Sequence, residues 1–211
     1  EKKNIIGVIK AYIENRALID LAPLVLCLRG INIPEKDIFK FSEEEQKVMR
    51  DILDAIEAGK IRKHIHFLNI SSQLELASTY RYFAKRGSVF ALTSLYEPFG
   101  LAPIEAAATG LVPVVTKNGG PSEIFLNGSG VLVDPKCSRS IARGLLEGLQ
   151  NHSQISKKAL RLVHDKYTWS GTARSYISTI KEVLGNGKKY AIEEPLRLDY
   201  HEQILRYLQG G

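Results

Sequence analysis

Residues 89–115, VFALTSLYEPFGLAPIEAAATGLVPVV, alternate between apolar runs and a segment of small residues. The runs Val89 to Thr93 and Val112 to Val115 are short, continuous and apolar, which favours buried strands. Between them, Ala102 to Thr109 has the composition of a short helix, and a loop with proline and glycine precedes it. The stretch therefore predicts a strand–loop–helix–strand unit, the repeating element of a parallel sheet.

The same alternation extends along the chain on both sides of this stretch. Further strands are predicted at Leu24 to Leu28, His64 to Leu68 and Gly130 to Val133. Further helices are predicted at residues 4–13, 42–59, 71–87, 138–149 and 169–184. This order predicts an α/β fold, a doubly wound Rossmann-like parallel sheet with helices on both faces. The loops after Leu28, Leu68, Leu92 and Val115 are then expected to share one rim of the sheet, where such folds bind ligands.

Two helix starts carry recognisable capping residues. Asn4 precedes an apolar stripe and is predicted to be an N-cap. Ser42 and Glu45 have the spacing of a capping box. The chain is expected to divide into a nucleotide-sugar-binding domain, residues 1–184, and a linker with a helical tail, residues 185–211.

Composition narrows the class of protein. The 211 residues are 44% hydrophobic and 25% charged, and no apolar run approaches the length of a membrane-spanning helix. The net charge of +6 is scattered among 23 acidic residues, which argues against nucleic-acid binding. Cys27 and Cys137 show neither a disulfide framework nor metal-like spacing. We expect a cytoplasmic protein without a membrane span.

The loop and helix after Thr93 carry the clearest candidate chemistry. Glu97 and Glu105 bracket this segment with seven residues between them. Backbone N–H groups at the helix start, together with the close approach that Gly100 allows, suit a diphosphate. Two carboxylates at one rim can bind hydroxyl groups. The spacing alone fits a second interpretation equally well. In that interpretation Glu97 begins a turn and Glu105 is a solvated helix residue.

These motifs resemble the retaining GT-B glycosyltransferases, a group that includes sucrose synthase, sucrose-phosphate synthase and glycogen synthase. The segments that carry the resemblance are 97–106 (EPFGLAPIEA), 110–115 (GLVPVV), 118–124 (NGGPSEI), 130–135 (GVLVDP) and 167–169 (YTW). The resemblance implies that the chain is the C-terminal half of such an enzyme. In that group Glu97 would bond the hydroxyls of the transferred sugar, and Glu105 would hold the ribose hydroxyls. Phe99, Gly100 and Leu101 would present backbone amides to the sugar and the diphosphate.

Two more positions are assigned by the resemblance. Lys3 matches a basic residue that contacts the donor diphosphate, although a lysine near a chain end is more often solvated. Leu68 and its neighbours match the loop whose backbone binds the uracil ring. The family also has an arginine several residues before the lysine, upstream of Glu1 in this numbering.

Other polar positions allow two interpretations. Arg29 could reach the cleft or pair with an acidic neighbour, and 118–121 could be a tight turn or a flexible loop beside the donor sugar. His64 and His66 are predicted to alternate along one strand, but two ligands make a poor metal site. The resemblance implies no metal and no cofactor other than the donor substrate.

Residues 2–5, 28–30, 91–94 and 118–121 look most like sucrose-phosphate synthase. The implied reaction transfers glucose from UDP-glucose to fructose 6-phosphate with retention at the anomeric carbon. The sugar phosphate acceptor would bind to an N-terminal domain that these residues do not resemble, so the chain alone is expected to bind nucleotide without turnover. The alternatives are another hexosyl- or mannosyltransferase of the group, or a non-catalytic nucleotide-binding module.

Overall fold

The computed structural model describes residues 2–185 and contains two units, Glu1–Thr168 and a second that begins at Trp169. The first unit comprises α1 (Ile5–Glu14), α2 (Arg16–Leu21), β1 (Leu24–Leu28), α3 (Pro34–Asp37), η1 (Ile38–Lys40), α4 (Glu43–Ala58), η2 (Arg62–His64), β2 (Ile65–Asn69), α5 (Gln73–Ala84), β3 (Val89–Leu92), α6 (Leu101–Ala107), β4 (Val112–Thr116), α7 (Pro121–Ile124), β5 (Val131–Val133), α8 (Ser138–Gln150) and α9 (His152–Lys166). The described part of the second unit is helix α10 (Trp169–Gly185). Beyond Gly185, the predicted linker and tail lie outside the described residues. No helix within residues 2–185 combines the length and apolarity needed to cross a membrane.

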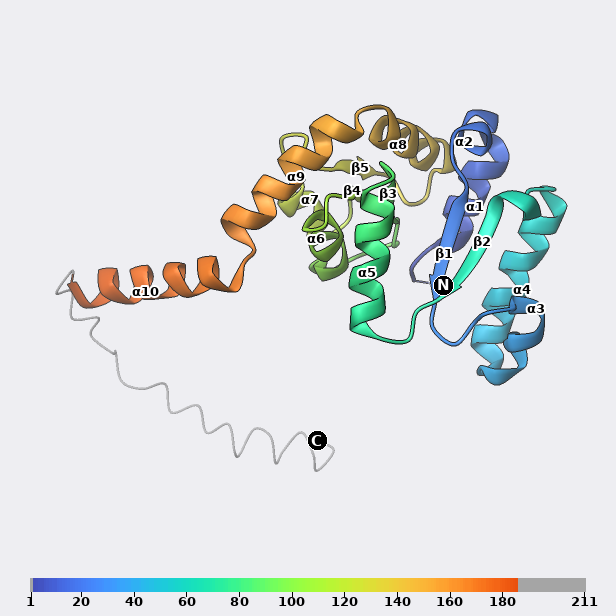
Figure 1. The fold of residues 1–211 in the computed structure, drawn as a ribbon, viewed down its shortest axis with the longest axis horizontal. Helices are drawn as coiled ribbons and strands as arrows, with labels where there is room; N and C mark the ends of the chain where they lie inside the picture. The colour runs from blue at the N-terminus through green and yellow to red at the C-terminus, as the bar shows by residue number, and fades with distance from the viewer. Residues whose placement is uncertain (1, 186–211) are drawn as a thin grey trace, which may run out of the picture. The chain divides into compact units, whose positions relative to one another are not determined.

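Strands β3, β4 and β5 form a parallel sheet with helices on both faces, as predicted. Helix α8 packs on one face, and α6 and α9 pack against β4 on the other (Figure 1). Adjacent residues of β4 divide between the faces, because Val114 belongs to the core cluster on the α8 side and Val115 to the cluster that includes α6 and α9. Gly144 in α8 lets that helix approach closely, since a Cβ there would lie 2.3 Å from the side chain of Val133.

Strands β1 and β2 form a second parallel sheet, paired in register from Leu24 opposite Ile65 to Leu28 opposite Asn69. One face is buried, because Leu26 and Ile65 join the core that α1 and α4 contribute. The other face is open, since Cys27 and Leu68 are exposed. The continuous apolar run of β1 predicts burial on both faces, and that prediction is wrong for Cys27.

The parallel strands predicted from the sequence are confirmed, but they lie in two sheets. Within residues 2–185, β1 pairs only with β2, and β3 pairs only with β4. A single core nevertheless connects the two sheets, because buried residues of α1, such as Ile9, cluster with Leu26 of one sheet and Val114 of the other. The Rossmann-like class therefore holds, with an interruption between β1 and β3.

The predicted helix caps have different outcomes. Ser42 and Glu45 form the complete capping box at the start of α4, with the Ser42 side chain accepting from the Glu45 backbone N–H. Asn4 has left-handed backbone angles (φ 54°, ψ 41°), and its side chain makes no cap hydrogen bond.

His64 ends the 3-10 helix η2 instead of beginning β2. His64 and His66 therefore do not alternate along one strand, and the prediction from the sequence pattern is wrong.

Candidate functional site

The loops after β3 and β4 are fastened together by their backbones. Glu97 donates its N–H to the carbonyl of Asn118 at 3.1 Å, and the Glu97 carbonyl accepts from the N–H of Gly120 at 3.0 Å. The Asn118 side chain donates to the carbonyl of Leu95 at 2.9 Å. These bonds extend the parallel pairing of β3 and β4 into a bridge between Glu97 and Gly119. The position of Glu97 is thus set by the backbone of the neighbouring loop.

Two adjacent glycines make this close approach possible. Gly119 has φ 98°, and a Cβ there would lie 2.2 Å from the Glu97 carbonyl oxygen. A Cβ on Gly120 would lie 2.3 Å from the carbonyl oxygen of Phe99. Both distances are impossible for an alanine without a backbone shift. Residues 118–121 therefore form a tight turn whose role is to hold the loop that carries Glu97 and Phe99.

Lys3 lies at the same rim, although 94 residues separate it from Glu97 in sequence. The Lys3 Nζ donates to the Glu97 carboxylate (Oε2) at 3.0 Å, and the side chains are 63% and 15% exposed, respectively. A backbone bond from the Leu95 N–H to the Lys2 carbonyl, at 3.1 Å, anchors the segment. The structure thus brings together the predicted diphosphate contact and the predicted sugar contact.

The remaining residues of the motif lie at the start of α6. Gly100 is buried with φ 108°, and it turns the chain into the helix. Phe99 and Leu101 flank it and are exposed by 51% and 65%. Glu105 is exposed one turn into α6. Burial raises the pKa of Tyr80 in α5 to about 12, and the charges of Glu105 and Cys27 add smaller contributions in the same direction.

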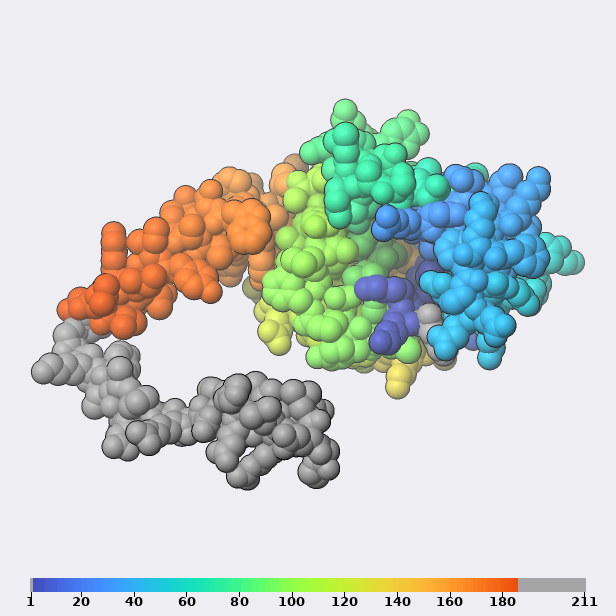
Figure 2. All heavy atoms as spheres, turned by 90° about the horizontal axis from the view of Figure 1, so that it is seen from below, coloured from blue at the N-terminus to red at the C-terminus, as the bar shows by residue number. Residues whose placement is uncertain are grey.

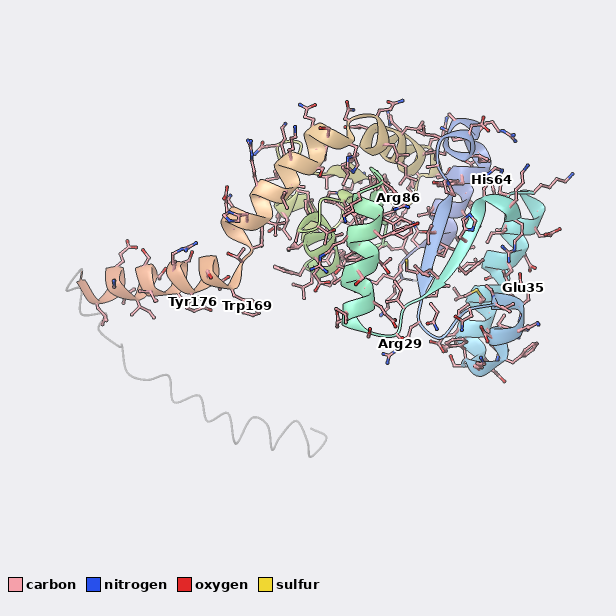
Figure 3. The ribbon with its side chains drawn as sticks, in the orientation of Figure 1. Arg29, Glu35, His64, Arg86, Trp169 and Tyr176 are labelled. Carbon is pink, nitrogen blue, oxygen red and sulfur yellow. The ribbon has the colours of Figure 1, made fainter. Side chains whose placement is uncertain are left out.

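One predicted site residue, Leu68, lies on the β1–β2 sheet, and one possible site residue, Arg29, directly follows β1. Leu68 is in β2, opposite Cys27, and no hydrogen bond joins it to Lys3 or to Glu97 within the described chain. Arg29 follows β1, is exposed, and has neither an ion pair nor a side-chain hydrogen bond among residues 2–185; it projects away from the ribbon (Figure 3). The alternative that Arg29 pairs with an acidic neighbour is therefore wrong for the described residues. His64 and His66 belong to no group of three potential metal ligands there.

Sequence reasoning missed the role of Asn4. Its side-chain nitrogen (Nδ2) donates to the Thr93 carbonyl at 3.0 Å and to the Pro135 carbonyl at 2.7 Å. Asn4 therefore joins the segment that carries Lys3 to the ends of β3 and β5. No local pattern indicates this, because the partners lie 89 and 131 residues away. The left-handed backbone of Asn4 is compatible with these bonds, since asparagine tolerates that conformation.

Comparison with sequences of known proteins places the first unit in a family. The model of the family described as glycosyl transferases group 1 matches residues 1–167. A probable sucrose-phosphate synthase of Thermosipho melanesiensis is 37% identical over 182 residues, which cover 86% of this chain and 39% of that protein. The sucrose-phosphate synthase of Zea mays is 36% identical over 184 residues, which cover 85% of this chain and 17% of that protein. The chain thus spans less than half the length of either relative.

Solved structures share the architecture. Anabaena HepE in complex with UDP has a TM-score of 0.67 at 18% identity, covering 86% of this chain and 46% of HepE. The C-terminal domain of a group 1 glycosyl transferase from Francisella tularensis has a TM-score of 0.64 at 23% identity, covering 80% of this chain and 81% of that domain. At these identities the likeness shows the fold alone. Together with the family match over more than half of the sequence, it shows that this chain belongs to the glycosyl transferases group 1 family and has a GT-B Rossmann-like fold.

Proposed function

We propose that this chain is the donor-binding domain of a retaining glycosyltransferase that transfers glucose from UDP-glucose to fructose 6-phosphate. The observation that carries the proposal is the pairing of Lys3 with Glu97 at the rim where the loops after β3 and β4 meet. A cation and a carboxylate side by side match the two chemical demands of a nucleotide sugar, a charged diphosphate and a hydroxyl-rich ring.

The roles follow from the charges. The exposed ammonium of Lys3 would turn from Glu97 to the donor diphosphate and stabilise the charge that grows on the departing nucleotide. Glu97, freed from that pair, would accept hydrogen bonds from the sugar hydroxyls. The backbone of Glu97 is fixed by hydrogen bonds to Asn118 and Gly120, so the position from which its side chain extends is set before the donor arrives. Phe99, Gly100 and Leu101 would offer backbone amides to the diphosphate.

The choice of substrates is supported by the relatives. Those from Thermosipho melanesiensis and Zea mays are named as sucrose-phosphate synthases, and solved structures of similar fold include HepE in complexes with UDP and with UDP-glucose. The acceptor would bind on another domain of the enzyme, and closure of the two domains would position the reactants. We propose a cytoplasmic enzyme without a metal at this site.

The ribose role of Glu105 can be tested by isothermal titration calorimetry with UDP. Glu105→Gln keeps the shape of the side chain but removes its charge, so we expect UDP to bind about 10- to 100-fold more weakly, the usual range for losing charge-assisted hydrogen bonds. Glu57→Gln is the matched control, since Glu57 is an exposed carboxylate on α4. Equal UDP affinity of the two variants would show that Glu105 does not hold the ribose.

A further inference from the structure

The ring of Tyr80 is buried in a small apolar cluster beside the candidate site. Tyr80 lies in α5, is 9% exposed, and clusters with Ala106 of α6 and with Leu111. Its ring packs edge-on against Phe90 of β3, with the ring centroids 5.6 Å apart. A phenylalanine would fill the same space, whereas a tyrosine adds a hydroxyl group that favours a hydrogen-bond partner. The hydroxyl is therefore the feature that packing does not explain.

Two polar groups at this cluster have no partner within residues 2–185. The Tyr80 hydroxyl forms no hydrogen bond there, and the Glu105 carboxylate has neither an ion pair nor a hydrogen bond. Glu105 directly precedes Ala106, which packs in the same cluster as Tyr80. The charge of Glu105 is also close enough to contribute to the raised pKa of Tyr80. A possible donor and a possible acceptor thus lie near each other on neighbouring helices.

Helices α5 and α6 lie side by side (Figure 1) and begin at the same end of the unit. A Cβ built on Gly110, just after α6, would lie 3.8 Å from the Cβ of Ala84 in α5. One turn earlier in each segment, Tyr80 clusters with Ala106. Helical side chains tilt toward the amino-terminal end of their helix. The Tyr80 hydroxyl and the Glu105 carboxylate therefore extend toward the end where α6 begins.

This end of the unit is hollowed. In Figure 2 the first residues of the chain, in dark blue, lie in a hollow between green residues, the colour of α5 and α6, and lighter blue residues. Lys3, in this first segment, pairs with Glu97 at 3.0 Å, just before α6 begins at Leu101. The unpaired hydroxyl and carboxylate thus extend toward the end that carries the candidate site.

The Cys27 thiol is the other titratable group whose charge would act on Tyr80. Burial raises the pKa of the Cys27 thiol, so the thiol stays protonated and uncharged at neutral pH. A neutral thiol is a weak acceptor, whereas a carboxylate accepts charge-assisted hydrogen bonds. The Tyr80 hydroxyl, with a pKa of about 12, is protonated and can donate. Glu105 is therefore the favoured acceptor for this hydroxyl.

We propose that Tyr80 is a positioning residue whose hydroxyl donates a hydrogen bond to the Glu105 carboxylate and holds it toward the ribose of the bound nucleotide. The inference rests on the proposed ribose role of Glu105. A carboxylate has two oxygens, so one can accept from Tyr80 while the other accepts from the ribose. Glu105 is exposed, and a bond to Tyr80 would reduce the rotamer entropy that its side chain loses when the nucleotide binds.

Calorimetric titration of the full-length protein with UDP and with 2′,3′-dideoxy-UDP tests the proposal. Tyr80→Phe removes the hydroxyl and keeps the ring that packs on Phe90. We expect UDP to bind about 5- to 10-fold more weakly to this variant, the effect of losing one hydrogen bond. The dideoxy nucleotide lacks the hydroxyls that Glu105 would hold, so its affinity is expected to stay the same. A purely structural role of Tyr80 would weaken the binding of both nucleotides equally.

Tyr82→Phe is the matched control. Tyr82 lies two residues further along α5, on another face of the helix, and is 52% exposed, so both affinities are expected to be unchanged. If the wild-type protein prefers UDP and Tyr80→Phe keeps that preference, the role of Tyr80 is wrong and the ribose role of Glu105 stands. If the wild-type protein binds both nucleotides equally, the ribose role and this inference fail together. An equal loss of preference in the two variants would also overturn the role of Tyr80.

Discussion

Gly119→Ala is expected to lower the free energy of unfolding by about 3 kcal/mol and to weaken donor binding at least tenfold. The new Cβ would lie 2.2 Å from the Glu97 carbonyl oxygen, and the backbone has φ 98°, so the turn and the loop must separate. Separation breaks the bonds that orient Glu97. Urea denaturation gives the loss of stability, and calorimetric titration with UDP-glucose gives the loss of affinity.

Gly87→Ala separates the clash from the backbone strain. Gly87 also has a positive φ, 70°, but no atom lies within 4 Å of a Cβ built there. This variant is expected to lose only about 1 kcal/mol, the cost of a left-handed conformation in a residue other than glycine, and to retain full donor affinity. If the two variants were equally stable and bound donor equally well, the contact between residues 97 and 119 would not define the site.

Lys3→Met in the full-length enzyme is expected to lower kcat about 100- to 1000-fold, the range found when a donor to a developing negative charge is removed. The Michaelis constant for the donor is expected to change far less, because the charge on the leaving diphosphate grows in the transition state. Stability is expected to change little, since the pair with Glu97 is largely exposed on the lysine side. Initial-rate kinetics at varied donor concentration provide both constants.

Lys2→Met is the matched control for this experiment. Lys2 is exposed and adjacent, and the hydrogen bond that anchors its segment uses its backbone carbonyl. The substitution removes the same charge from the same surface and leaves the pairing of Lys3 with Glu97 in place. If kcat fell by the same factor in both variants, the effect of Lys3 would be one of general surface charge, and its assignment to the leaving group would be wrong.

Local sequence patterns predicted the elements that are determined by residues close together in the sequence. The apolar run of β3 and the capping box of Ser42 and Glu45 were both predicted and confirmed, because a strand run and a capping box are determined by nearby residues. The adjacency of Lys3 and Glu97 required the family resemblance. Nothing local connects residues 94 positions apart.

The errors arose where distant partners decide the structure. Asparagine is a residue type favoured at helix N-caps, but the side chain of Asn4 bonds to Thr93 and Pro135, whose positions depend on the whole sheet. Cys27 lies in a run that reads as buried, because an apolar run does not distinguish a strand covered on both faces from one covered on a single face. The interruption between β1 and β3 is likewise a property of strand order, which hydrophobic periodicity does not encode.

The central proposal is that this domain binds a uridine diphosphate sugar through Lys3, Glu97 and Glu105, at the end of the sheet where Lys3 meets Glu97 and α6 begins. The most direct test is calorimetric titration of the full-length protein with UDP-glucose and with GDP-mannose, repeated on Glu105→Gln. Saturable binding that prefers UDP-glucose and weakens in the variant is the predicted result. Preference for GDP-mannose would assign the domain to a different donor, and the absence of binding by either nucleotide sugar in the folded protein would contradict a donor site altogether.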